Sequence, residues 1–410
     1  MEDLRKELAL KIIENVGSSG TPPVFGLKYY SVGLDKYLDV IDKEYFEHFV
    51  PYGGAAFKLV VGIYGGGKTH FLYSIRDRAW ERNFITSYVQ LSPGESPFHR
   101  LDLVYRAIVN GLQPPLSVES SLINPSQGLE HLIKWLFAKK YRALEKQGFS
   151  NEEIRNKMII DLEEHLEEIE NKSFSRAIKG LFEALLDDNQ NKFNDILQWL
   201  TVEGFDKKKL TRYGILQRID KTSAFSMIRS LAQFIKEEGF AGLIILFDEA
   251  ERIPSLSSQQ TELHLNNLRE LIDECGQPNF QNIMIFYAVP DETFLEGRTQ
   301  TYEALKQRLS TVFDFFNPTG IKIDLEKLNK DPIKTLTEIG NKLLKVFEKA
   351  YEISLESDEL KSTIQKIAEK AYETRFGDVG YKRIFVQNVI KAFHYAKNLG
   401  KIPRVEDLGM

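Results

Sequence analysis

The stretch Gly62-Ile63-Tyr64-Gly65-Gly66-Gly67-Lys68-Thr69 is a complete G-x-x-x-x-G-K-[ST] phosphate-binding loop. An apolar run at residues 57–61 precedes the loop, and residues 70–80 follow it with apolar side chains at helical spacing. This order of strand, loop and helix is the context in which such a loop binds a nucleoside triphosphate. The pattern therefore predicts a P-loop NTPase, an α/β fold in which helices flank a parallel sheet.

The loop residues have separable expected roles. Glycines let consecutive backbone N–H groups approach phosphate oxygens, and the following helix adds its positive N-terminal dipole. We expect Lys68 to reach the β- and γ-phosphates of ATP and the hydroxyl of Thr69 to bind Mg²⁺. The residues expected to surround the nucleotide here are Gly62, Tyr64, Gly65, Gly66, Gly67, Lys68, Thr69 and His70. The alternative is a glycine-rich turn that matches by chance, which the flanking strand and helix argue against.

A second motif completes this site. Residues 242–247 form an unbroken apolar run, as in a strand covered on both faces, and it ends in Asp248-Glu249-Ala250-Glu251. This pattern is typical of a Walker B strand. We expect Asp248 to hold Mg²⁺ through water and Glu249 to act as the general base that activates the attacking water. The alternative is two acids at a strand end without a catalytic role.

The remaining pattern predicts an AAA+-like NTPase of the additional-strand class. Further strands are expected at residues 84–89, 283–289 and 312–316, and further helices at 98–112, 302–309, 333–352, 357–374 and 381–398. The expected units are an N-terminal prelude near the nucleotide (1–55), an ATPase core (56–113 and 219–325), a helical insertion (114–218) and a C-terminal helical lid (326–410).

Residues outside the two motifs are candidates for nucleotide contacts. Tyr30 and Val32 precede the loop and are candidates for a wall against adenine, although plain packing explains them equally well. Arg308 ends a predicted helix where an arginine finger can reach a neighbouring subunit's nucleotide, or it forms a surface salt bridge. Arg383 is the candidate lid arginine that contacts the γ-phosphate, with Lys382 as its rival.

Two other positions need an interpretation. The strand after the Walker B strand usually carries a polar sensor, but here the position falls on Tyr287, Ala288 or Asp291. The acidic residues around His165 have metal-ligand chemistry, but their i, i+4 spacing is typical of a solvated helix face. The absence of an N-K-x-D sequence after the core favours adenine over guanine.

Composition limits the possible partners. The chain has 410 residues and a formal net charge of −5, so it lacks the basic excess of an autonomous nucleic-acid binder. DNA contact would need local basic patches, for which the candidates are residues 139–142, 207–209 and the group Lys391, Lys397, Lys401 and Arg404. The single cysteine, Cys275, fits a reducing cytoplasm, and no apolar run approaches the roughly 20 residues of a membrane span.

The motifs also carry a family resemblance. The chain resembles the ATP-binding proteins of BREX-type phage-defence systems in residues 63–72, 89–93, 103–109 and 246–251, and in the opening segments 20–23 and 30–33. The resemblance covers about residues 10–110 and 222–400 and is poor across the predicted insertion. It implies an AAA+-like ATPase, related to origin-recognition and Cdc6 proteins, that acts in a defence complex and often beside a helicase. Gly380 departs from those relatives, which place an arginine there.

Two functions follow from these observations. The first is an ATP-hydrolysing switch or motor, acting as a homo-oligomer or with defence-system partners. The second is a nucleotide-gated assembly module with little intrinsic hydrolysis. A helicase in its own right and a small-molecule kinase are both disfavoured, because the chain lacks a second recombinase-like domain and carries a helical lid.

Overall fold

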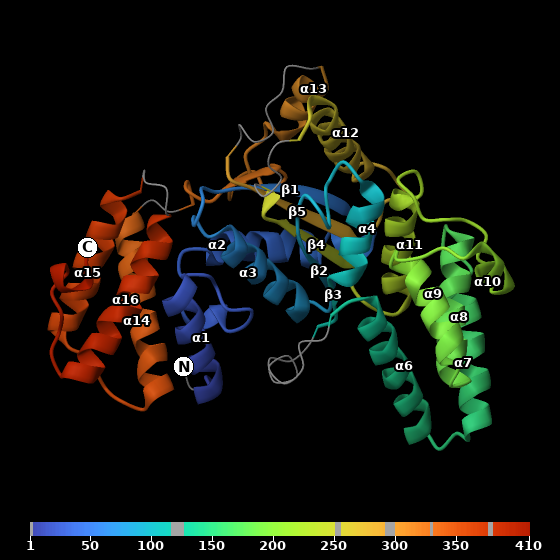
Figure 1. The fold of residues 1–410 in the computed structure, drawn as a ribbon, viewed down its shortest axis with the longest axis horizontal. Coiled ribbons are helices and arrows are strands. Elements are labelled where there is room, and N and C mark those ends of the chain that lie inside the picture. Colours follow the sequence, from blue (N-terminus) through green and yellow to red (C-terminus); the bar gives the residue numbers. More distant parts are fainter. Residues whose placement is uncertain (1–2, 116–126, 251–255, 292–299, 329–330, 376–379) are drawn as a thin grey trace.

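The computed structural model describes residues 3–115, 127–250, 256–291, 300–328, 331–375 and 380–410 (Figure 1). Glu251 and the predicted helix break at 377–379 lie outside these ranges.

At the centre is a six-stranded sheet in the order β3-β2-β4-β5-β1-β6. Its strands are β1 (Ala55–Val61), β2 (Ile85–Gln90), β3 (Leu112–Gln113), β4 (Leu243–Asp248), β5 (Ile283–Val289) and β6 (Lys322–Asp324). The short β3 pairs antiparallel with β2, whereas the other strand pairs are parallel. The predicted α/β fold with a mostly parallel, helix-flanked sheet is thus confirmed.

The two central strands explain the unbroken apolar runs in the sequence. Every residue of β4 and of β5 is buried, because helices cover both faces of the sheet at this point. In the strand order, β5 lies between β1, which leads into the glycine-rich loop, and β4, which ends in Asp248. The two motif-bearing strands are therefore separated by one additional strand.

The predicted strand at 312–316 is wrong. Val312 forms an isolated bridge with Lys322, and the edge strand of the sheet is β6 instead. The chain turns at Asp314, whose carboxylate accepts hydrogen bonds from the backbone N–H groups of Phe316 and Asn317. Phe315 is 66% exposed and Phe316 92% exposed, so two of the three aromatic residues that suggested a strand face solvent, whereas Phe313 is buried.

Different helices cover the two faces of the sheet. On one face lie α2 (Asp35–Ile41), the π-helix η2 (Asp42–Glu47) and α3 (Lys68–Glu81), which pack on alternate residues such as Leu246 and Phe286. On the other face, α4 (Leu101–Asn110), α11 (Ala224–Glu237) and α12 (Ser258–Glu274) pack on the intervening residues, such as Tyr287. Helix α13 (Gln300–Leu309) lies against α12 (Figure 1).

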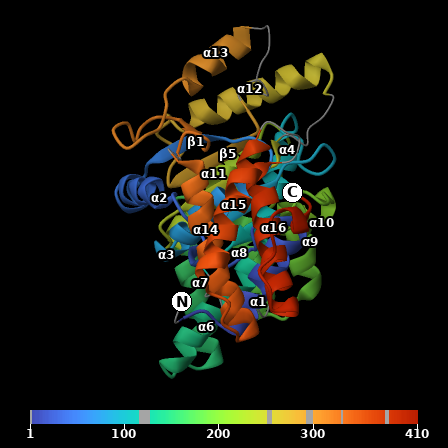
Figure 2. The same cartoon turned by 90° about the vertical axis from the view of Figure 1, so that its left-hand side faces the viewer.

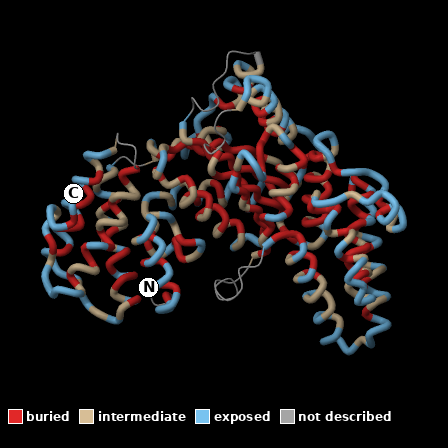
Figure 3. Tube along the Cα trace, viewed as in Figure 1, coloured by how far each residue is buried: buried red, intermediate tan, exposed pale blue. Residues whose placement is uncertain are grey.

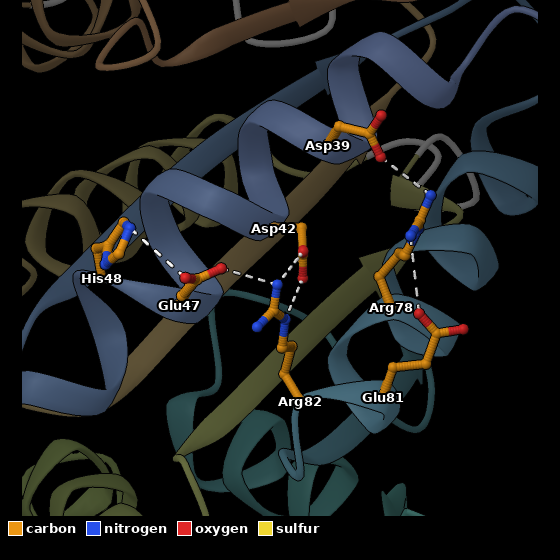
Figure 4. A network of polar contacts seen from close by, with 7 residues as sticks. All are labelled: Asp39, Asp42, Glu47, His48, Arg78, Glu81 and Arg82. Carbon is orange, nitrogen blue, oxygen red and sulfur yellow. Dashed lines mark hydrogen bonds and ion pairs between the residues drawn. The ribbon is translucent and has the colours of Figure 1, made fainter.

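A network of ion pairs joins α2 and η2 to the end of α3 (Figure 4). Arg82 pairs with Asp42 at 2.7 Å and with Glu47 at 2.9 Å, and Arg78 pairs with Asp39 at 3.0 Å. Such partly exposed pairs each contribute about 0–1 kcal/mol, so the network orients these elements more than it stabilises them. The short helix η3 (Val50–Tyr52) then leads into β1.

The region predicted as helical between 114 and 218 contains α6 (Leu129–Lys146), α7 (Asn151–Leu166), α8 (Lys172–Leu186), α9 (Gln190–Leu200) and α10 (Lys207–Arg212). A capping box of Ser150 and Glu153 begins α7. These helices share one continuous hydrophobic cluster with the sheet face that α11 covers. The buried residues of α6 all lie in its first half, so its second half extends away from the core (Figure 3).

The C-terminal helices are α14 (Pro332–Tyr351), α15 (Asp358–Glu373) and α16 (Tyr381–Leu399), followed by the short η6 (Glu406–Leu408). Helix α1 (Lys6–Ser19) packs on α14 and α16 and shares their hydrophobic cluster, so the two ends of the chain build one helical bundle (Figure 2). The short helix η1 (Leu27–Tyr29) connects this bundle to the sheet region. None of the helices in the described ranges is both long and apolar enough to cross a membrane.

Candidate nucleotide-binding site

The glycine-rich loop connects β1 to α3 at the carboxyl edge of the sheet. Gly65 and Gly67 have φ angles of +68° and +99°, a left-handed backbone that favours glycine. Gly67 is the residue before the first turn of α3, so the open N–H groups of this helix begin at the loop. The loop therefore has the left-handed turns and the open helix N-terminus that anion-binding turns use.

Lys68 lies within this turn and is 6% exposed. Its ammonium group donates hydrogen bonds to the carbonyl oxygens of Gly62, at 2.9 Å, and Ile63, at 3.3 Å. These acceptors belong to the loop itself. The ammonium group is thus folded back onto the glycine-rich loop.

The structure brings Thr69 and Asp248 together, although 180 residues separate Lys68 from Asp248 in the sequence. The Thr69 hydroxyl donates to Oδ2 of Asp248 at 2.6 Å. The same oxygen accepts a hydrogen bond from the hydroxyl of Tyr88 on β2 at 2.7 Å. The first turn of α3 and the ends of β2 and β4 meet at one edge because these strands are parallel neighbours.

Glu249 follows Asp248 with an unusual backbone conformation. Its φ angle is +59°, a left-handed conformation that costs a residue other than glycine about 1–3 kcal/mol. Its backbone N–H donates to Oδ1 of Asp248 at 2.8 Å. Such strain persists where the surrounding structure fixes it. The half-buried Glu249 directly follows Asp248, whose carboxylate accepts the hydrogen bond from Thr69.

A pocket lies between the glycine-rich loop, the N-terminal segment and the C-terminal helices. Its empty volume, including the part that is open to solvent, is about 900 Å³. Tyr30, Val32 and His70 line it together with Gly65 to Gly67. Val16, Leu336, Ile339 and Val386 add apolar surface from α1, α14 and α16.

His70 is fixed within this pocket. Its Nε2 atom lies 2.6 Å from the Ser31 hydroxyl, and its ring packs edge-on against Tyr30 with 5.4 Å between ring centroids. Burial, and to a smaller extent the positive charge of Lys382, lower the pKa of His70 to about 4. The imidazole is therefore neutral at physiological pH and acts as a hydrogen-bonding wall of the pocket.

The N-terminus of α16 lies directly on the loop. Lys382 donates to the carbonyl of Gly66 at 2.7 Å and pairs with Glu326 at 3.2 Å. Arg383 instead donates to the Tyr64 hydroxyl at 3.1 Å, and its guanidinium lies 5.1 Å from the centre of that ring. Burial lowers the pKa of Lys382, and the charge of Glu326 opposes this shift. Both candidate cations thus contact the loop.

The contacts of Gly380 explain why the arginine expected at this position from the origin-recognition relatives is absent from this chain. A Cβ at this position would lie 2.2 Å from the carbonyl oxygen of Tyr64 and 2.6 Å from Cα of Gly65. The backbone of the C-terminal bundle therefore contacts the backbone of the loop, and an arginine at 380 would separate the two. In this chain the cations follow the contact point, at positions 382 and 383.

The other candidates lie elsewhere. Arg308, on α13, forms a two-point ion pair with Asp273 on α12, at 2.5 and 3.0 Å, and so does not reach the loop within its own chain. Tyr287 lies on the sheet face opposite α3 and contacts His264 at 3.1 Å. Of the three possible sensor positions, Ala288 packs in the α3-side cluster and Asp291 is exposed.

The candidate basic patches are partly neutralised by local partners. Lys140 pairs with Asp161 at 2.7 Å and Glu238 at 2.9 Å, and Lys209 pairs with Asp195 at 3.1 Å. Within the described ranges, no group of three or more His, Cys, Asp or Glu side chains is arranged to hold a metal ion, including the acidic face around His165.

Sequence reasoning missed several polar contacts of the site. Tyr88, Ser31, Glu326 and Tyr381 each contact a predicted site residue or one of its partners. Tyr88 had a detectable signal, because it lies near the carboxyl end of a predicted strand, the edge at which parallel sheets bind ligands. Glu326 and Tyr381 had none, because their contact depends on how the C-terminal bundle docks.

Comparison with known proteins identifies the family. The family model described as BREX system ATP-binding protein BrxC/D matches residues 4–403 of the chain. Searches of the curated proteins and of the solved structures give no significant match. The match covers nearly the whole sequence, including the insertion that the resemblance in individual motifs did not reach. The chain therefore belongs to the family of BREX system ATP-binding proteins BrxC/D.

Proposed function

We propose that this chain is an AAA+-like ATPase that works as a switch or motor subunit of a BREX defence complex. The observation that carries the proposal is the 2.6 Å contact between Thr69 and Asp248, with Glu249 as the next residue. Two oxygen donors and a further carboxylate thereby lie beside a phosphate-binding loop. The strand order, with β5 between β1 and β4, supports the additional-strand class.

The residues fit a magnesium nucleotide. Mg²⁺ prefers oxygen ligands and is usually held by one or two protein groups together with phosphate oxygens and water. Thr69 and Asp248 supply such oxygens, and Lys68 and the loop N–H groups would bind the phosphates. When bound, Mg²⁺ supplies neutralisation of charge on the phosphates. Glu249 would accept a proton from the attacking water.

The pocket supports adenosine as the remainder of the ligand. Tyr30 and Val32 would pack on the base, and His70 would hold Ser31 and Tyr30 in place. Lys382 contacts Gly66 more directly than Arg383 does, so we assign the γ-phosphate contact of the C-terminal bundle to Lys382, with Arg383 clamping Tyr64. The units 56–113 with 219–325, 114–218 and 326–410 would act as core, insertion and lid, with 1–55 as the segment that closes the base pocket.

Partners enter the proposal through Arg308. In an oligomer, Arg308 would leave its partner Asp273 and contact the nucleotide of a neighbouring subunit. It would then act as an arginine finger. A defence-system helicase and DNA are the further partners, and DNA affinity should be modest because the basic patches are locally paired. The proposed place of action is the cytoplasm.

A nucleotide-gated assembly module with slow hydrolysis is the second candidate. The direct docking of α16 on the loop favours it, because nucleotide would change this contact before any bond is broken. Of the three candidate sensor positions, Ala288 packs on the α3 side of the sheet and supplies no polar group there.

The decisive test compares wild type with Glu249→Gln. If the chain is an ATPase, Mg²⁺-dependent phosphate release falls about 100-fold or more, the usual contribution of a general base, while ATP binding measured by calorimetry remains. Hydrolysis that is unchanged in the variant would sink this assignment. Negligible wild-type hydrolysis with ATP-dependent oligomerisation in both proteins would select the assembly module.

A further inference from the structure

The carboxylate of Asp248 has an unusually complete set of hydrogen-bond donors. Oδ2 accepts from the hydroxyls of Thr69, at 2.6 Å, and Tyr88, at 2.7 Å. Oδ1 accepts the backbone N–H of Glu249 at 2.8 Å. A carboxylate offers about four lone-pair positions, so these three contacts leave one, on Oδ1. Tyr88 therefore decides which lone pair remains available.

Tyr88 is itself held rigidly. It lies on β2 beside β4, where it is paired with Leu246 in the parallel register. Its ring packs against that of Tyr73, with 4.9 Å between the two ring centroids. The Arg76 guanidinium lies 4.6 Å from the Tyr73 ring and 4.5 Å from the Trp80 ring, and Arg76 is 1% exposed. This stack fixes the direction from which Tyr88 donates.

We propose that Tyr88 is a positioning residue that aims Asp248 at the magnesium ion of the bound nucleotide. This inference rests on the proposed function. Without Tyr88, only the Thr69 hydroxyl and the Glu249 N–H would hold the Asp248 carboxylate. The Thr69 hydroxyl can rotate about its Cα–Cβ bond, so the carboxylate would still be able to turn. The second hydroxyl on Oδ2 removes this freedom and presents the remaining lone pair of Oδ1 to a metal-bound water. Contacts of this kind outside the metal ligands typically change metal affinity 10- to 100-fold.

The test removes one oxygen atom. Tyr88→Phe keeps the ring, and with it the contact to Tyr73, but deletes the donor to Asp248. Tyr105→Phe is the matched control, because Tyr105 is also a buried tyrosine and its hydroxyl has no protein partner in the described structure. The full-length proteins are titrated with Mg²⁺ at fixed fluorescent ATP analogue, and nucleotide binding is also measured in EDTA. Thermal unfolding checks that the variants are folded.

We expect the Mg²⁺ concentration for half-maximal effect to rise about 10-fold in Tyr88→Phe, with binding in EDTA unchanged and Tyr105→Phe equal to wild type. Identical Mg²⁺ curves for wild type, Tyr88→Phe and Tyr105→Phe would overturn this inference alone. Wild type that binds no nucleotide would overturn the proposed function as well.

Discussion

Two buried lysines near β1, Lys58 and Lys68, differ in where their hydrogen-bond acceptors lie along the chain. Lys58 lies within the strand and donates to the Tyr45 hydroxyl at 2.8 Å and to the carbonyls of Pro318, at 2.9 Å, and Gly320, at 2.5 Å. Its ammonium group also lies 4.4 Å from the centre of the Tyr45 ring. Lys68, beyond the carboxyl end of the strand, donates to carbonyls of its own loop.

The comparison sets a structural cation, Lys58, beside Lys68, the cation that we propose binds phosphate. The acceptors of Lys58 come from η2 and from the connection before β6, so its ammonium group fastens two distant segments to β1. The carbonyls of Gly62 and Ile63 carry only partial charge, whereas a phosphate group carries a full negative charge and attracts an ammonium group more strongly. Lys68 can therefore exchange partners when an anion arrives, whereas Lys58 cannot do so without opening the fold.

The largest expected effect tests this difference directly. Lys68→Ala should weaken ATP binding about 100-fold, because hydrogen bonds that involve a charged group contribute about 1.5–3 kcal/mol each. Lys58→Met should leave ATP affinity unchanged, since Tyr45 still donates to Pro318 and the loop is untouched. Calorimetry with ATP and Mg²⁺ measures both. An equal loss of affinity in the two variants would break the comparison.

A smaller effect is expected where the C-terminal bundle meets the loop. Gly380→Ala forces a Cβ against the carbonyl of Tyr64, and overpacking of this kind costs about 1–3 kcal/mol. We expect ATP affinity to fall about 10-fold as α16 moves off the loop and Lys382 loses Gly66. Gly94→Ala is the control, because a Cβ there meets no atom within 4 Å. Full affinity in Gly380→Ala would mean that this contact does not contribute to the nucleotide site.

The smallest effect concerns Lys58 and pH. Burial lowers the pKa of Lys58 from 10.5 to about 7, so between these values the unfolded chain binds a proton that the folded chain releases. Stability from this group therefore rises with pH across that window, by at most about 1.4 kcal/mol per pH unit, and is constant below about pH 7. The difference in Tm between wild type and Lys58→Met should shift in favour of wild type from pH 7 to pH 9. A difference that stays constant would show that Lys58 does not titrate there.

Much of the fold was predictable because it depends on local pattern. Strands β4 and β5 are covered on both faces and read as unbroken apolar runs, and α14 to α16 have regular helical spacing with capping residues or glycine at their starts. The aromatic segment after α13 misled the prediction, because β-forming residues also occur in exposed turns, where Asp314 and not burial fixes the backbone.

For the candidate site, the sequence by itself determined the chemistry: a loop of glycines for phosphate, one ammonium group, one hydroxyl and an acidic pair at a strand end. Only the tertiary structure decided which further groups join them. Tyr88 reaches Asp248 because β2 pairs with β4. Lys382 reaches Gly66 because Gly380 and Gly65 have no side chains and let the backbone before α16 contact the backbone of the loop. Helix α1 joins the C-terminal bundle because its apolar face packs on α14 and α16. Periodicity records what neighbours in the chain require, whereas contacts between distant segments are set by strand order and packing, which no short pattern contains.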